Sequence, residues 1–127
     1  MLEIGALRSA SDDAAGRRAE VLAATLAARL RASPQEDRAE ILGQAARRSA
    51  IEILLVDQGG QAVVNETYGT PDQPRIVGYL VRGRGETKTA LGRVRFAAAP
   101  LGAPLSELSV ITFVAAPSLP SGAVPML

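Results

Sequence analysis

Basic residues are concentrated in one stretch of this chain, and their types and spacing are suited to binding an anion. Between residues 75 and 95 they are Arg75, Arg82, Arg84, Lys88, Arg93 and Arg95, against one acid, Glu86. An arginine pair can hold a carboxylate or phosphate through two parallel hydrogen bonds. Because Arg93 and Arg95 are two positions apart, they share one face of a strand.

We therefore place a candidate site for a small anionic ligand at Arg93 and Arg95. The strand expected beside them carries Arg82, with Tyr79 and Arg75 on its opposite side, and these residues complete the candidate set. A solvated sheet face, or a surface that touches anionic lipid headgroups, is the alternative interpretation.

Two glycine-containing stretches invite comparison with anion-binding loops. In the first, Asp57 precedes Gly59 and Gly60, which is also the chemistry of a hairpin turn, since Asp bonds its own backbone and Gly accepts positive φ. In the second, "GRGETK" over residues 83–88, the spacing of a phosphate-binding loop is absent and a strand follows instead of a helix. We interpret both stretches as turns.

The composition argues against catalysis. The chain has no cysteine and no histidine, which removes thiol nucleophiles, imidazole bases and the usual zinc ligands. A Ser-Lys dyad needs a buried lysine, and the single lysine, Lys88, lies beside a turn between two threonines. We expect no enzyme activity, no catalytic residue, no metal site and no cofactor.

Length and charge narrow the class further. The 127 residues are 47% hydrophobic and 21% charged, which is typical of one globular domain. The net charge of +1 does not indicate a nucleic-acid-binding protein. No stretch is long and apolar enough to span a membrane, although the chain could be a piece of a membrane protein.

The elements that must position these residues begin with helices. Residues 14–32 are rich in Ala, Leu and Arg, and Leu22, Leu26 and Leu30 recur every four residues. This stripe predicts a face that packs on a core. The helix is about 20 residues, or ~30 Å, long, so we also expect part of the stripe to pair with a second copy in a homodimer.

A second helix is expected up to about Arg48. Ser33 can cap its start, Pro34 suits the first helical position, and Glu36 completes a capping box. The helical part of the domain is thus placed at residues 1–48.

Strands are expected over the second part of the chain, from residue 51 to 116. The segments with strand character are 51–57, 62–67, 75–83, 87–99 and 109–117, joined by short links that favour antiparallel neighbours. A proline-containing tail over 117–127 is expected to be irregular. The fold class is therefore α+β, with both helices packed on a five-stranded antiparallel sheet.

This order resembles a known family over roughly residues 14–117. The apolar strand and glycine turn of "IEILLVDQGGQAVVNE", followed by "GRVRFAAAPLGAP" and "LSVITFVAAP", are similar to the extracytoplasmic PAS-like (Cache, or PDC) sensor domains of bacterial two-component histidine kinases. The resemblance implies a sheet of order 2-1-5-4-3. It also implies a receptor fragment on the periplasmic side of the inner membrane, held there by flanking spans and signalling through its N-terminal helix.

Two departures separate the chain from that family. One is the absence of the Arg/His/Lys cluster with which citrate-type members bind carboxylates, and the other is the link between the second and third strands. Only residues 68–75 are expected between the second and third strands, whereas family members carry helices and a loop there as a roof over the ligand. The rival interpretation, a cytoplasmic adaptor of the roadblock or profilin-like type, needs a long helix at the same place. The expected lack of that helix favours the sensor, and predicts either a small pocket or signalling through dimer contacts. A third interpretation is an anion-binding accessory domain of an enzyme, with its ligand at Arg93 and Arg95.

Overall fold

The computed structural model describes residues 2–116, with side chains from residue 12 onward. In chain order the elements are α1 (Leu2–Arg31), the short 3₁₀ helix η1 (Gln35–Asp37), α2 (Arg38–Ser49), β1 (Glu52–Asp57), β2 (Ala62–Glu66), α3 (Gln73–Arg82), β3 (Arg84–Thr89), β4 (Gly92–Pro100) and β5 (Leu108–Ala115). The tail expected to be irregular, 117–127, lies outside the described residues.

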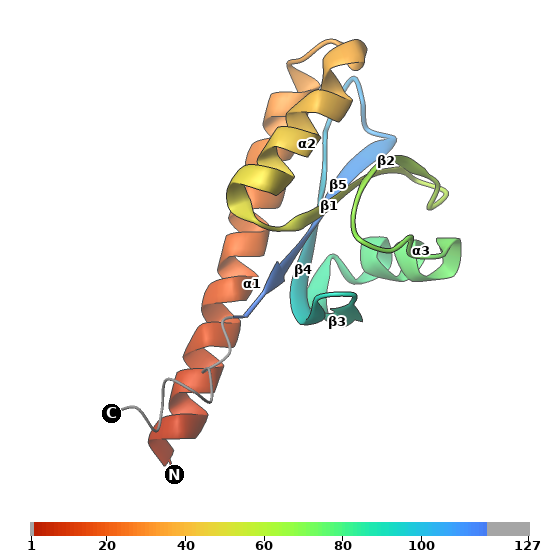
Figure 1. Cartoon of the computed structure of the whole chain (residues 1–127). Coiled ribbons are helices and arrows are strands. Elements are labelled where there is room, and N and C mark those ends of the chain that lie inside the picture. The colour runs from red at the N-terminus through yellow and green to blue at the C-terminus, as the bar shows by residue number, and fades with distance from the viewer. Residues whose placement is uncertain (1, 117–127) are drawn as a thin grey trace.

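The sheet is the middle of three layers. Its strands run β2-β1-β5-β4-β3 with every neighbouring pair antiparallel, which confirms the α+β class and the order 2-1-5-4-3. α1 and α2 cover one face, and α3 lies across the other (Figure 1). Each face has its own apolar core, because a sheet that is apolar on both faces must be covered on both.

The face of α1 that meets the sheet is made largely of alanine. Ala15, Ala19, Ala23 and Ala27 recur every four residues, and each is at most 4% exposed. Such small side chains let the helix backbone approach the strands closely. On β5 the hydroxyl of Thr112 donates a 2.7 Å hydrogen bond to the backbone carbonyl of Ala19.

The predicted capping box before α2 is wrong. The hydroxyl of Ser33 donates 2.7 Å to the carbonyl of Arg29 in the last turn of α1, where helix carbonyls lack intrahelical partners. η1 follows, and no side chain caps η1 or α2. α2 ends at Ser49, and the capping residue Ala50 adopts a left-handed conformation with φ 54°.

The turn between β1 and β2 is the hairpin turn predicted from Asp57 and its glycines. Oδ1 of Asp57 accepts hydrogen bonds of 2.9 Å from the backbone N–H groups of Gly59 and Gln61. Gly60 has φ +85°, a conformation that disfavours any side chain. No anion nest is needed to explain these residues.

The strand predicted over 75–83 is wrong, because these residues lie almost entirely in helix α3. Asp72 caps its start by accepting a 3.0 Å hydrogen bond from the N–H of Arg75. Ile76 and Tyr79 are buried against the sheet at helical spacing. Gly83 ends the helix with φ 77°. The Ile, Val and Tyr content suggested a strand, but the two caps and the helical period decide the outcome.

Because residues 75–83 are almost entirely helical, the third strand lies later in the chain than predicted. β3 begins at Arg84, inside the stretch interpreted as a turn, and its hairpin turn falls at Ala90 and Leu91 inside the predicted long strand. Five strands result all the same. β3 is an edge strand on which side chains alternate between exposed and half-buried, as suits charged and threonine residues.

Across the described part of the chain, no helix has both the length and the apolar character needed to cross a membrane.

Candidate functional site

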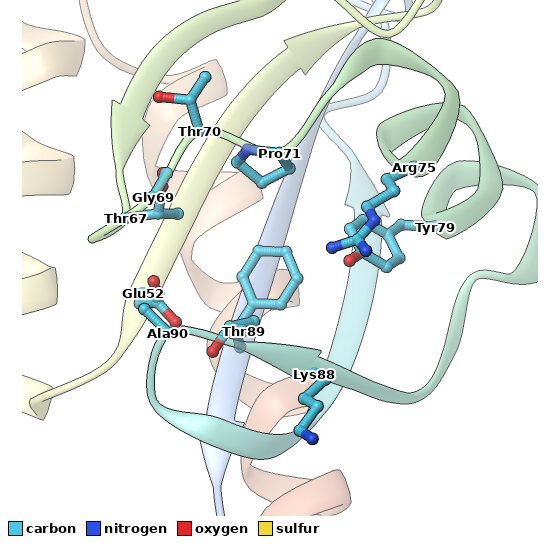
Figure 2. A pocket seen from close by; sticks show the side chains of 11 residues that line it. Glu52, Thr67, Gly69, Thr70, Pro71, Arg75, Tyr79, Lys88, Thr89 and Ala90 are labelled. Carbon is cyan, nitrogen blue, oxygen red and sulfur yellow. The ribbon is translucent and has the colours of Figure 1, made fainter.

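A pocket lies between α3, the loop that leads to it and the β3–β4 hairpin, over the sheet face that α3 covers (Figure 2). Its volume is about 340 Å³, near the lower end of the range of small-molecule sites, roughly 300 to 1,000 Å³. The lining residues are Glu52, Thr67, Gly69, Thr70, Pro71, Arg75, Tyr79, Lys88, Thr89, Ala90 and Phe113. We call it the Glu52 pocket.

Glu52 is the first residue of β1 and the only buried carboxylate among the described side chains, at 1% exposure. Alternation along the strand fixes its direction. Ile53 and Leu55 belong to the core under α1 and α2, whereas Leu54 and Val56 belong to the core under α3. Glu52 is in phase with the second pair, so its side chain enters the pocket.

The two carboxylate oxygens of Glu52 have different surroundings. Oε2 accepts a 2.9 Å hydrogen bond from the backbone N–H of Tyr68. Oε1 is buried and has no hydrogen-bond partner among the described residues. Within that same part of the chain no arginine or lysine forms an ion pair with Glu52. An unsatisfied buried acceptor costs about 1–3 kcal/mol, and a charged one more.

The side of the pocket opposite Glu52 carries Arg75 and Tyr79 of α3 (Figure 2). Arg75 is exposed, and Tyr79 is buried with its hydroxyl 3.1 Å from that of Thr87. Between α3 and the sheet the rings of Tyr79 and Phe113 stack edge to face, with centroids 5.3 Å apart. The pocket thus joins an acidic end, an aromatic wall and a basic rim.

Another hollow, of about 290 Å³, adjoins this rim and is lined by Arg75, Gly78, Tyr79, Arg82, Thr87 and Lys88. Arg75, Tyr79 and Arg82 share one face of α3, so the expectation that Arg82 points the opposite way is wrong. A strand would separate them, but the spacing i, i+4, i+7 brings them together on a helix. The guanidinium of Arg82 lies 4.9 Å from the ring centroid of Phe96 and donates to the carbonyl of Glu86.

Arg93 and Arg95 lie on the other side of the sheet, which separates them from Arg75 and Tyr79. They do share one face of β4, as their spacing predicts. Arg93 is exposed and donates a 2.5 Å hydrogen bond to Glu86, which raises the pKa of Arg93. Arg95 lies against Gly16 of α1, where its Nε is buried without a hydrogen-bond partner in the described region. The five residues of the predicted cluster therefore form no single site.

Two of the three leucines predicted as a dimer surface are core residues of the monomer. Leu26 is 5% exposed and Leu30 is fully buried, and both pack with the alanine face of α1 against the sheet. Leu22 is half-buried at the edge of the same core. Leu26 and Leu30 are thus unavailable to a second copy.

The sequence also indicates Glu52 as a candidate site residue, although our prediction placed the site at the arginines. The segment "IEILLVD" is apolar except for its last residue, Asp57, and this one glutamate. Charged residues are almost never fully buried without a partner, so an acid inside such a strand indicates either a partner or a ligand.

The described residues include no group of three or more acidic side chains placed to hold a metal ion. No family model, no curated protein and no solved structure matches this chain.

Proposed function

We propose that this chain is the extracytoplasmic signal-sensing domain of a bacterial transmembrane histidine kinase. The observation that carries the proposal is the Glu52 pocket itself, which lies under α3 on an antiparallel sheet whose other face holds a long N-terminal helix. The helix α3 also removes one of the two departures from the family, because it lies between β2 and β3, where a roof over the ligand is needed.

The contacts support a route from the pocket to α1. Phe113 of β5 lines the pocket on one face of the sheet. The next residue along the strand, Thr112, points to the other face and bonds the backbone of α1 at Ala19. A ligand that displaces Phe113 would therefore shift a strand to which α1 is hydrogen-bonded, and α1 is the element proposed to carry the signal.

Homodimerisation belongs to this proposal, through the exposed side of α1 in place of Leu26 and Leu30. Val21, which is 63% exposed, lies on that side. Sedimentation of the purified chain over a range of concentrations tests this part. A reversible dimer weakened by Val21→Glu is expected, and a monomer at every concentration would contradict it.

The experiment that tests the function is the DNA sequence on both sides of this coding segment, with the membrane topology of the full-length product. We expect an apolar span before residue 1, another after residue 127, and a histidine-kinase core beyond. Alkaline phosphatase fused within the segment should then be active outside the cytoplasm. An inactive fusion, or a reading frame without spans, would contradict the proposal.

A second candidate is a cytoplasmic adaptor of the roadblock or profilin-like type. It gains support from α3, since the expected lack of a helix between the second and third strands counted against it. Such an adaptor acts through its surface and does not need a buried, unpaired carboxylate in a pocket. The same sequencing experiment separates the two candidates.

A further inference from the structure

The unpartnered oxygen of Glu52 is the strongest unexplained feature of the described residues. An ionised carboxylate accepts hydrogen bonds at two oxygens and donates none. Oε2 accepts a hydrogen bond from the N–H of Tyr68. Oε1 is buried, has no partner among the described residues, and belongs to a residue that lines a pocket of about 340 Å³. Because an uncompensated buried charge is costly and no described residue supplies a donor, we expect a bound ligand to supply it.

From this arrangement we infer that the Glu52 pocket binds a small molecule through a protonated primary amine, whose N–H groups donate to Oε1 of Glu52. The inference rests on the proposed ligand-sensing function and names the chemistry of the ligand. It differs from the anionic ligand expected at Arg93 and Arg95, which lie across the sheet.

Charge and shape favour an ammonium group over an acid at this end. A ligand carboxylate beside Glu52 would place two acceptors of like charge together in a buried site. An ammonium group supplies three donors and balances the charge. The rings of Tyr79 and Phe113 offer an aromatic wall that accommodates the alkyl part of an amine.

The other end of the pocket determines which of two classes of amine fits, a plain alkylamine or an amino acid. Arg75 lies opposite Glu52 (Figure 2) and is exposed, so it can pair with an acid group on the same ligand. A plain alkylamine uses Glu52 alone, whereas an amino acid of suitable length uses both ends. Arg75→Gln should weaken binding of the amino acid and leave that of the alkylamine unchanged.

The test is titration calorimetry of the 127-residue chain with n-butylamine, γ-aminobutyrate and butyrate at equal concentrations. We expect one or both amine-bearing probes to bind, and butyrate to bind at least tenfold more weakly. This comparison uses the unaltered protein, so it decides the question even where a variant fails to fold.

Glu52→Gln sharpens the test. The N–H of Tyr68 needs an acceptor, so the new amide oxygen takes the place of Oε2 and the amide NH₂ takes that of Oε1. The pocket then presents a donor where it presented an acceptor. Amine binding should fall about tenfold or more, since ~1.4 kcal/mol is one factor of ten and hydrogen bonds to charged groups exceed this. Butyrate binding should rise.

Glu107→Gln is the matched control, because it makes the same change at an exposed carboxylate in the loop before β5. It should bind amines as the unaltered chain does. Three results would overturn the inference: butyrate binding as tightly as n-butylamine, amine binding unchanged in Glu52→Gln, or no binding of either amine at millimolar concentration. The last would mean that water alone satisfies Oε1.

Failure here is separable from failure of the proposed function. Binding is measured on the isolated chain and does not depend on membrane placement. A chain between two membrane spans that binds no amine keeps the receptor proposal and loses this inference, whereas an amine-binding chain without spans does the reverse.

Discussion

Glu52 and Arg93 are both charged residues on strands, yet their surroundings differ completely. Arg93 is exposed, and the hydrogen bond to Glu86 raises its pKa. Its folded pKa thus lies above its unfolded value, so any stabilisation is present below the ordinary arginine pKa and lost only in strong alkali. Salt and solvent screen such an exposed pair. Glu52 is buried, and only one of its two carboxylate oxygens has a hydrogen-bond partner among the described residues. For this reason Glu52, and not Arg93, marks the candidate site.

At the same scale, Gly60 is required by both its backbone and its contacts. Its φ is +85°, and an added Cβ would lie 2.7 Å from Cγ2 of Val77 on α3. Gly60→Ala should therefore lower the free energy of unfolding by about 1–3 kcal/mol. The measurement is urea denaturation followed by circular dichroism.

Gly59→Ala is the control for this change, one position earlier in the same turn. Its Cβ would meet only Oδ1 of Asp57, at 3.4 Å, and its φ lies outside the left-handed region. It should cost clearly less than Gly60→Ala. Equal losses for the two variants would contradict the packing of α3 over this turn.

At the scale of elements, α3 shows how local capping overrides composition. Its residues favour strands by type, but Asp72, an early proline and Gly83 are start and stop signals of a helix. The buried positions Ile76 and Tyr79 then face the sheet together, and Arg75 reaches the pocket rim. A strand over these residues would have placed Ile76 and Tyr79 on opposite faces of the sheet.

Two glycines test the extent of α3. Gly78 lies inside the helix with nothing within 4 Å of an added Cβ, so Gly78→Ala should raise the free energy of unfolding by about 0.5–1 kcal/mol. Gly83 also has open space but caps the helix with φ +77°, so Gly83→Ala should destabilise by roughly 1 kcal/mol.

Thermal and urea denaturation of both variants are the measurements. The two substitutions are chemically identical and both are sterically free. The test is therefore whether their changes in the free energy of unfolding have opposite signs. Destabilisation by Gly78→Ala together with no effect of Gly83→Ala would contradict the helix and return these residues to a strand.

At the scale of the whole molecule, the sheet connects two sites that lie on opposite faces. The Glu52 pocket and the α1 interface share strand β5, on which Phe113 lines the pocket and the adjacent Thr112 bonds α1. α1 is also fixed to the far edge of the sheet, where Glu20 pairs with Arg84 at 3.3 Å. α1 is thus an integral part of the domain between residues 15 and 30.

Leu30→Ala tests that integration. Leu30 is fully buried between α1 and the sheet, so its truncation should lower the free energy of unfolding by about 2–5 kcal/mol. Val81→Ala, at a position 80% exposed on α3 and outside the proposed dimer surface, should change it by at most about 0.5 kcal/mol. Chemical denaturation measures both, and a small loss for Leu30→Ala would mean that α1 is only loosely held.

The strand order 2-1-5-4-3 was expected only from the resemblance to PAS-like domains, whereas the sequence by itself determined the leading helices, the Asp-Gly turn and the α+β class. These follow from periodicity, turn chemistry and short connections, all of which act between near neighbours in the chain. The helical signals of α3 were also local, in Asp72 and Gly83, but the strand-like composition outweighed them in the interpretation. Only the tertiary structure decided which face of the sheet each charged residue occupies. It separated Arg95 from Arg75, buried Leu30 in the monomer and left one oxygen of Glu52 unpaired, because burial depends on which distant element covers a strand.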